Sequence, residues 1–418
     1  MSEPQRYIKN YFKRFADSKP VLQKPISPKT EMIIVIPCHN EPNLMGTLDS
    51  LLQCEQPECK VEVIVVVNNS ESVDRESEIR SSNLRTINIC YDWNMSKSKE
   101  GIKFHLIEAL ELPKKNAGVG LARKIGMDEA LRRFTHLGKN GSIICLDADC
   151  QVSKSYLTSI FEEFHLTDHG IGEMHYEHRY ELEEDNDLKE GIINYELHLR
   201  YYVDGLKTAG FPNAIQTVGS CMLVKSDIYA KHGGMNKRKA GEDFYFLHKI
   251  VPHEDFTTVV GATVYPSCRI SDRVPFGTGK AQQNWLDKSE KEYSTYNPQT
   301  FAELKTLFDS LDSLFEGDRS GLSVIVMSFF EDHNYWPKME LILNNSKTLN
   351  SFRKQFFVWF DGFLCMKFMH YCRDHHYPDL PILQATSTFY KEEFLESTSV
   401  PNNQLMLQWY RQQVLIEK

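Results

Sequence analysis

The stretch from Ile143 to Cys150 constrains the fold of this chain more than any other. Its apolar residues 143–146 run directly into Asp147 and Asp149, two carboxylates separated by one small residue. Such a run is typical of a parallel strand buried on both faces, and ligands of open α/β sheets bind beyond the carboxyl ends of these strands. Because unpaired acids are costly there, the pair predicts a site for Mg²⁺ or Mn²⁺ carrying a diphosphate. From these residues alone, a polar strand end that caps the next helix is the alternative.

Apolar runs of strand length alternate with amphipathic runs of helix length over the first two thirds of the chain. Strand, helix and strand in that order predict a parallel sheet with right-handed crossovers. We therefore expect an α/β fold with an open, mostly parallel sheet flanked by helices. Strands are predicted at 32–36, 61–67, 104–107, 143–146, 218–224 and 257–264, and helices at 44–52, 121–134, 156–164, 192–206 and 244–250.

The composition changes near residue 285, where aromatic residues begin to recur at helical spacing. Residues 285–418 are therefore predicted to form a helical C-terminal region, and residues 31–284 the α/β domain. Residues 1–30 are predicted to be a short N-terminal helix and a proline-punctuated linker. Basic and aromatic residues alternate within 7–15, so a helix packed on the body is favoured and a peripheral membrane contact stays open.

Charge and cysteine content narrow the function classes. The 418 residues carry a net charge of −9, which disfavours a nucleic-acid partner. The ten cysteines are scattered and form no CxxC pair, as in a chain whose thiols are reduced. We find no apolar run long enough to span a membrane and no signal-peptide core, so a cytoplasmic protein without an integral membrane segment is expected.

Several motifs, in order, resemble those of the family-2 glycosyltransferases with the GT-A fold. The resemblance covers about residues 31–270 and implies that 31–284 form a GT-A glycosyltransferase domain. It implies transfer of one sugar from a nucleotide-diphosphate sugar to an acceptor hydroxyl, with inversion of the anomeric configuration. The motifs are Ile36–Glu41, Asn116–Arg123, Leu146–Asp149, Gly219–Lys225, Gly233–Met235 and Glu242–Asp243.

The resemblance also implies roles for single residues. Asp147 and Asp149 hold the metal ion, and Asp243, with Glu242 beside it, is the catalytic base. A helix N-terminus is expected to keep Asp243 ionised. Arg269 and Arg273 lie on a loop that suits a diphosphate. The predicted nucleotide and donor contacts are Pro37, His39, Asn40, Glu41, Asn68, Asn116, Arg123, Asp147, Gly219, Arg269 and Arg273.

Some alternatives stay open. Asn68 stands where the family usually has an acid, so the base of the donor is undetermined. A third metal ligand is open between His248 and His253. The acceptor is a glycan, a lipid-linked compound or a small molecule. The rival functions are a retaining GT-A transferase, a nucleotidyltransferase and a non-catalytic binding protein on the same fold.

Overall fold

The computed structural model describes residues 3–16, 21–97, 100–271, 273, 275–389 and 402–416. The chain divides into two compact units. The first contains Met1–Leu182 and Thr217–Lys280, and the second contains Glu183–Gln216 and Ala281–Lys418.

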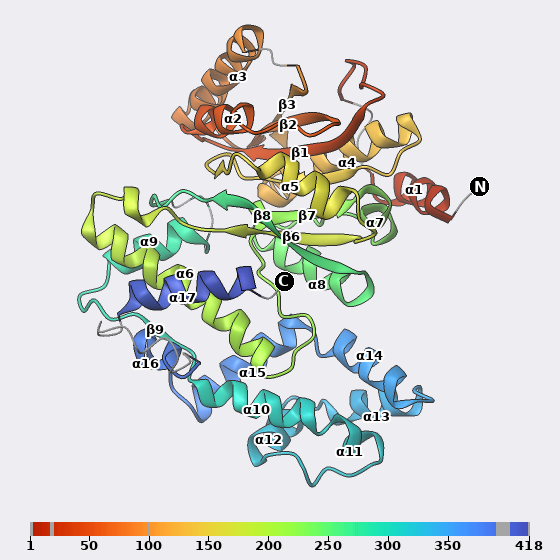
Figure 1. Ribbon diagram of the computed structural model, residues 1–418, viewed down its shortest axis with the longest axis vertical. Helices are drawn as coiled ribbons and strands as arrows, with labels where there is room; N and C mark the ends of the chain where they lie inside the picture. Colours follow the sequence, from red (N-terminus) through yellow and green to blue (C-terminus); the bar gives the residue numbers. More distant parts are fainter. Residues whose placement is uncertain are drawn as a thin grey trace. The chain divides into compact units, whose positions relative to one another are not determined.

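An eight-stranded sheet forms the centre of the first unit (Figure 1). Its order is β3-β2-β1-β4-β7-β6-β8-β5, and the pairs β3–β2, β2–β1, β1–β4 and β6–β8 are parallel. The predicted α/β fold with an open, mostly parallel sheet is thereby confirmed. The strands are β1 (Thr30–Cys38), β2 (Lys60–Ser70), β3 (Ile102–Leu112), β4 (Ser142–Cys145), β5 (Gln151–Val152), β6 (Ile171–Tyr176), β7 (Met222–Lys225) and β8 (Phe256–Tyr265).

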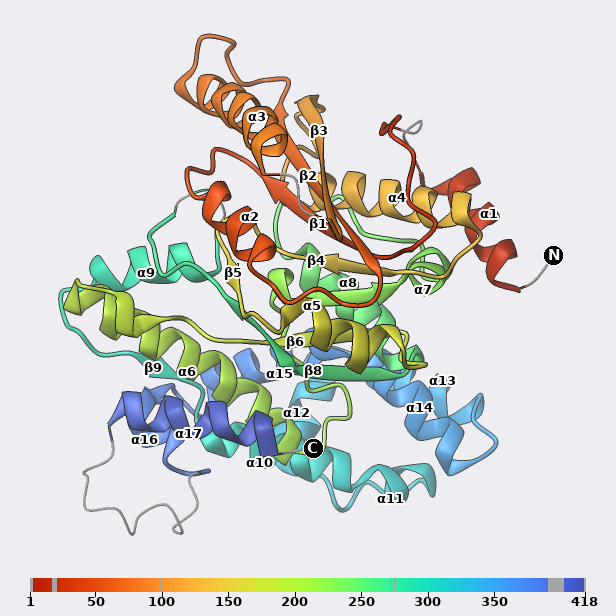
Figure 2. The ribbon, with the colours of Figure 1, turned by 45° about the horizontal axis from the view of Figure 1, so that its top comes forward.

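Helices cover both faces of this sheet (Figure 2). On one face α4 packs against β1 and β2, and on the other α3 packs against β2 and β3, where Trp93 contacts Phe104 edge to face. Because both faces are covered, the central strands are apolar along nearly their whole length. The helices are α1 (Glu3–Arg14), α2 (Leu44–Leu52), α3 (Glu78–Ser96), α4 (Val119–Leu137), α5 (Tyr156–Ile160), α7 (Ser226–Lys231) and α8 (Glu242–Ile250).

Two predicted elements are shorter than expected. The helix from 156 ends as α5 at Ile160 and continues as a π-helical turn over Phe161–His165. The strand predicted at 218–224 begins only at Met222, because Gly219–Cys221 form a 3₁₀ turn. That turn places Gly219 beside the acids described below.

The N-terminal helix α1 packs on the first unit through a buried polar cluster. Tyr11 donates a hydrogen bond to Asp128 at 2.5 Å, and Lys124 donates to Tyr11 at 2.6 Å and to Asp128 at 2.8 Å. Tyr229 of α7 also donates to Asp128, at 2.7 Å. Tyr11 therefore anchors α1 to α4 and α7.

The second unit is helical, with a small antiparallel pair of β9 (Ser294–Thr295) and β10 (Leu380–Pro381). Glu196, which is fully buried, accepts hydrogen bonds from Arg200 and Arg411 and so joins α6 to α17. The helices of the second unit are α6 (Asn186–Thr208), α9 (Thr278–Leu286), α10 (Pro298–Asp309), α11 (Leu311–Phe315), α12 (Val324–Asp332), α13 (Trp336–Asn344), α14 (Leu349–Trp359), α15 (Gly362–His375), α16 (Ile382–Thr386) and α17 (Asn403–Ile416). The first residues of α9 belong to the first unit.

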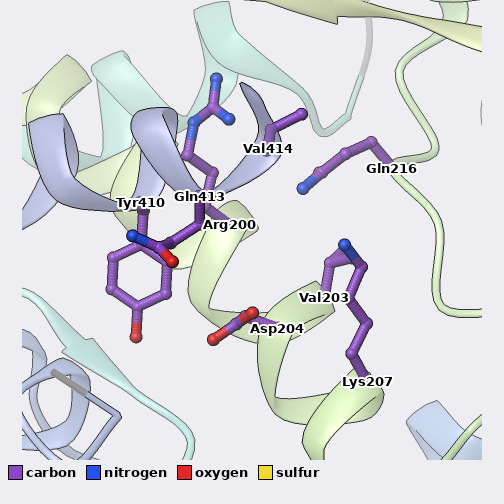
Figure 3. Close-up of a pocket in the computed structure, with 8 residues that line it drawn as sticks. All are labelled: Arg200, Val203, Asp204, Lys207, Gln216, Tyr410, Gln413 and Val414. Carbon is purple, nitrogen blue, oxygen red and sulfur yellow. The ribbon is translucent and has the colours of Figure 1, made fainter. Parts of the chain in front are cut away.

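A small cavity lies between α6 and α17 (Figure 3). Arg200 and Asp204 line it from α6, and Tyr410 and Gln413 line it from α17. Its volume of about 20 Å³ holds roughly one water molecule, which is too little for a nucleotide. Within the described residues, no helix is both long and apolar enough to cross a membrane.

Candidate active site

Asp147 and Asp149 follow β4 at the carboxyl end of the parallel strands. The Leu146 amide still pairs with the Val35 carbonyl at 3.1 Å, so the chain leaves the sheet only at Asp147. The Thr47 hydroxyl of α2 then donates to the Ala148 carbonyl at 2.9 Å. This contact fixes the backbone between the two acids and leaves both carboxylates partly exposed, with 39% of the Asp147 side chain accessible.

Arg123 of α4 lies between two of the predicted acids. Its Nη2 donates to Oδ1 of Asp147 at 2.5 Å, and its Nη1 donates to Oε1 of Glu242 at 2.8 Å. Arg123 is 1% exposed and Glu242 is 3% exposed. A planar guanidinium can bind two carboxylates at once, so one buried cation links the end of β4 to the start of α8.

Asp243 lies beside this ion pair, next to Gly219. A Cβ atom at position 219 would lie 2.6 Å from Nη1 of Arg123 and 2.8 Å from Oδ2 of Asp243. Any side chain there would collide with both groups, which explains the glycine. The Phe244 amide donates to Oδ1 of Asp243 at 2.8 Å, so the carboxylate covers the first turn of α8.

Burial acts on the pKa values of both acids at the start of α8. Burial raises the pKa of Asp243, although Arg123 and the Phe244 amide oppose this. Burial also raises the pKa of Glu242, to about 7, against the lowering effect of Arg123. The pKa of Asp243 therefore shifts in the direction opposite to the one that a helix N-terminus favours, because loss of water around the carboxylate outweighs that effect.

The loop after β8 brings two arginines to Glu41 and Asp149. Arg273 Nη1 donates to Oε2 of Glu41 at 2.7 Å, and Arg269 Nη2 donates to the same oxygen. Both also reach Oδ2 of Asp149, at 3.2 Å from Arg269 and 3.4 Å from Arg273. Burial raises the pKa of Glu41, with Asp149 adding to the effect. Four of the predicted site residues therefore form one charged cluster.

His39 and Asn40 are held at the end of β1 by contacts with β2 and α3. His39 Nδ1 donates to the Asn68 carbonyl at 2.9 Å, and the Asn40 amide donates to Oδ1 of Asn83 at 2.8 Å. Asn83 donates in turn to the Asn68 carbonyl at 3.2 Å. Asn40 has a φ of +47°, which asparagine tolerates better than most residues. Asn83 had no signal in the sequence, because an asparagine inside a helix is unremarkable by itself.

The amide side chains at the end of β2 are buried. Asn68 is 4% exposed, and Asn69 is fully buried with no hydrogen-bond partner for either of its amide atoms within the described residues. Pro37 is buried inside β1, where it pairs in register with Val66. Asn116 lies in the turn after β3, where its amide donates to the Pro113 carbonyl at 2.9 Å. In the described part of the chain, no hydrogen bond joins its side chain to the other candidate residues.

The acids offer two carboxylates to a metal ion. Asp147 uses Oδ1 for Arg123, and its other oxygen accepts no hydrogen bond from the described residues. On Asp149, Oδ2 contacts the two arginines and Oδ1 faces only the Cys150 thiol, at 3.9 Å. Mg²⁺ is commonly held by one or two carboxylates together with substrate phosphates and water, so the pair fits such an ion. Within the described residues, no group of three or more His, Cys, Asp or Glu residues could hold one.

The two histidines considered as a third ligand lie in other contacts. His248 packs on Phe244 with ring centroids 4.4 Å apart, and burial lowers its pKa to about 4. Its Nδ1 is buried and has no partner among the described residues. His253 stacks on His232 with centroids 5.9 Å apart. Neither joins the acids in a metal-binding group of the described residues.

Comparison with solved structures gives remote similarities to TarS from S. aureus. The TarS fragment 1–349 has a TM-score of 0.35 at 14% identity, covering 57% of this chain and 60% of that one. The same fragment in complex with UDP has a TM-score of 0.36 at 12% identity, again covering 57% of this chain and 60% of that one. The complex with UDP-GlcNAc gives 0.36 at 14% identity, covering 67% of this chain and 66% of that one. The chain thus spans about 60% of the length of the first of these structures.

The family comparison is more direct. No curated protein sequence matches the chain. Residues 33–233 match the family model described as glycosyl transferase family 2. The matched segment contains Arg123, Asp147, Asp149 and Gly219, whereas Asp243 and the loop arginines lie beyond its end. Residues 33–233 of the chain, just under half of its length, are therefore similar to glycosyl transferase family 2.

Proposed function

We propose that the protein is a metal-dependent enzyme that moves one sugar from a nucleotide-diphosphate sugar to an acceptor hydroxyl and inverts the anomeric configuration. The observation that carries this proposal is the grouping of Asp147, Glu242 and Asp243 around Arg123 at the carboxyl end of the sheet. Asp147, one acid of the pair suited to a cation, thereby lies in the same group as Asp243, a half-buried acid suited to accepting a proton.

The donor diphosphate is assigned to the side of Asp149 and the loop arginines. Arg269 and Arg273 are planar cations that match phosphate oxygens bidentately. In the structure their charges are balanced by Glu41 and Asp149. A bound diphosphate offers the same kind of oxygen, so the two arginines exchange carboxylate partners for phosphate partners when the donor binds.

Asp147 and Asp149 would hold Mg²⁺ or Mn²⁺, and when bound this ion neutralises the charge that develops on the departing diphosphate. The residues of the chain contribute the remaining interactions. Arg269 and Arg273 orient the diphosphate, and the enclosed end of β1 around His39 and Asn40 is assigned to the nucleoside.

Asp243 is assigned as the base that takes the proton of the acceptor hydroxyl. The hydroxyl oxygen forms a bond to the anomeric carbon while the bond from that carbon to the diphosphate breaks, and its electron pair leaves with the diphosphate. Attack from the side opposite the leaving group inverts the configuration. A raised pKa favours this role, because a base is most effective when its pKa approaches the working pH.

A panel of UDP-, GDP-, ADP- and dTDP-sugars tests the proposal. Each donor is incubated with Mn²⁺ and the protein, and release of the nucleoside diphosphate is measured. We expect hydrolysis of at least one donor, lost in the Asp147→Asn/Asp149→Asn double variant. The matched control is Asp49→Asn, whose carboxylate accepts a hydrogen bond from Trp93 at 3.1 Å and belongs to no candidate site. A folded protein that neither cleaves nor binds any donor in the panel would contradict the proposal.

A further inference from the structure

We propose that Arg123 is a positioning residue that couples the metal-binding end of the site to its base, and that it does not contact the donor. This inference rests on the proposed function and reassigns a residue that the resemblance had placed among the donor contacts. In the structure both arms of its guanidinium are occupied by carboxylates, Asp147 at 2.5 Å and Glu242 at 2.8 Å. The side chain is 1% exposed and presents no surface to a diphosphate.

The ion pair spans two elements that carry different parts of the chemistry. Asp147 follows β4 and stands next to the proposed cation, whereas Glu242 is the first residue of α8 and directly precedes Asp243. Because Arg123 binds both carboxylates, it sets the separation of the two elements. A change in that separation moves Asp243 relative to a donor held at Asp149.

The backbone around Arg123 is built for this close approach. A Cβ atom at Gly120, one turn before Arg123 on α4, would lie 2.3 Å from the Arg238 carbonyl oxygen and 3.0 Å from Cβ of Glu242. Only glycine therefore lets the start of α8 come this near to α4. Gly219 leaves the corresponding space on the other side, next to Arg123 and Asp243. Asn236 adds a hydrogen bond to the Glu242 carbonyl at 2.9 Å.

Charge alone does not replace the geometry of Arg123. A lysine at this position would keep the positive charge, but its ammonium is a point charge that cannot hold the two carboxylates in one plane. Arg123→Lys should therefore keep the positive charge and lose the fixed separation. Small displacements of catalytic groups can cost about 100-fold in rate.

The test compares Arg123→Lys with Arg133→Lys, a matched variant on the same helix. Arg133 is 5% exposed and forms a two-armed ion pair with Glu62, at 2.6 and 2.8 Å, outside the site. For each variant we would measure the thermal midpoint of unfolding and the kcat and KM for the donor. We would also measure the affinity for UDP in the presence of Mn²⁺, or for another nucleoside diphosphate if the wild type releases that one. Glu242→Gln, which keeps an acceptor for Arg123, is the second probe of the same link.

We expect both lysine variants to lose a similar amount of thermal stability, since each weakens one buried two-armed ion pair. Arg123→Lys should lower kcat by about 30- to 100-fold while the affinity for UDP changes by less than about threefold. Arg133→Lys should leave kcat near the wild-type value. Glu242→Gln should lower kcat less than Arg123→Lys does.

Two results would overturn the inference. A loss of UDP affinity in Arg123→Lys with kcat retained would make Arg123 a donor contact, and equal kcat values in both lysine variants would make it an ordinary structural ion pair. Failure of the proposed function is distinguishable, because the wild-type protein itself would then show no donor cleavage and no UDP binding.

Discussion

Arg273 donates a hydrogen bond to Oε2 of Glu41 at 2.7 Å, and Arg269 shares the same oxygen. The Glu41 side chain is 1% exposed, and its other oxygen accepts from the Asn43 amide at 2.8 Å. Glu41 therefore anchors the loop after β8 to the end of β1. This contact assigns Glu41 to the arginines, whereas the sequence had suggested a contact with the nucleotide.

Glu41→Gln should free the two arginines for the diphosphate. The substitution keeps the shape of the side chain and removes its charge, so an incoming diphosphate no longer competes with a buried carboxylate. We expect UDP affinity with Mn²⁺, measured by calorimetry, to stay equal or to rise by about a few-fold, because the arginines are partly exposed and an ion pair with an exposed partner is worth little.

The control for this variant is Glu111→Gln, which removes an exposed carboxylate paired with Arg80 at 2.7 Å. That change should leave UDP affinity as it is. A tenfold loss of affinity in Glu41→Gln alone would show that Glu41 itself contacts the nucleotide.

Binding of the nucleoside diphosphate should require a divalent cation. Without the cation, the carboxylates of Asp147 and Asp149 repel the diphosphate, and the arginines remain paired with Glu41 and Asp149. Titration of UDP with Mn²⁺ and then with EDTA should show at least about a tenfold difference in affinity, which corresponds to about 1.4 kcal/mol. Equal UDP affinity under both conditions would contradict a role for a metal ion in diphosphate binding.

The sheet and the position of the acids follow from local patterns in the sequence. The runs that became β1, β2 and β4 are almost uninterrupted apolar segments, and a parallel strand covered on both faces requires such a run. Because these strands are parallel, their carboxyl ends meet at one edge, which brings Asp147 and Asp149 near the end of β1.

Other features depend on distant contacts that no local pattern records. The six-residue strand β6 (Ile171–Tyr176) was not predicted, because it contains Gly172, Glu173 and His175 and lacks the apolar run of its neighbours. The roles of Arg123 and Glu41 depend on partners 119 and 232 residues away in the chain. The sequence likewise shows an acid at a helix start for Asp243, but its raised pKa depends on how completely the fold encloses it.

Asn69→Leu should stabilise the protein. Both amide atoms of Asn69 are buried without a partner in the described part of the chain, and a leucine of similar size removes that desolvation cost. We expect a gain of roughly 1–3 kcal/mol in unfolding free energy, seen as a higher urea midpoint. UDP affinity should not change.

Asn83→Leu is the matched control, because Asn83 is equally buried but uses its amide for Asn40 and Asn68. The Asn83→Leu variant should unfold at a lower urea midpoint than the wild type. If Asn69→Leu reduced UDP affinity without a gain in stability, Asn69 would be a reader of the base.

Glu242 should make stability fall as the pH rises. Burial raises the folded-state pKa of Glu242 from 4.5 to about 7, so the folded protein holds this proton more tightly than the unfolded chain does. The resulting stability is present below pH 4.5 and is lost as the pH rises toward about 7. Glu242→Gln mimics the protonated form, so the wild-type urea midpoint should decline relative to that variant between about pH 5 and pH 7.5.

Glu62→Gln provides the opposite case. Burial there raises the pKa, but hydrogen bonds with His105 and Arg133 outweigh it and lower the pKa below its usual value. The stability that this lowered pKa contributes is lost only as the pH falls below about 4.5. The urea midpoints of the wild type and of Glu62→Gln should therefore change in parallel between pH 5 and pH 7.5. Parallel curves for Glu242→Gln as well would mean that Glu242 is ionised throughout this range.

The rate of sugar transfer by Asp243→Asn tests the central claim most directly. Asparagine keeps the side-chain shape and the oxygen that accepts from the Phe244 amide, but it cannot take a proton from the acceptor. With the donor identified in the panel, kcat should fall by about 10²–10⁴, while UDP affinity in Mn²⁺ stays near the wild-type value. Wild-type kcat in Asp243→Asn, or a loss of UDP affinity that accounts for the whole defect, would contradict the assignment of Asp243 as the base.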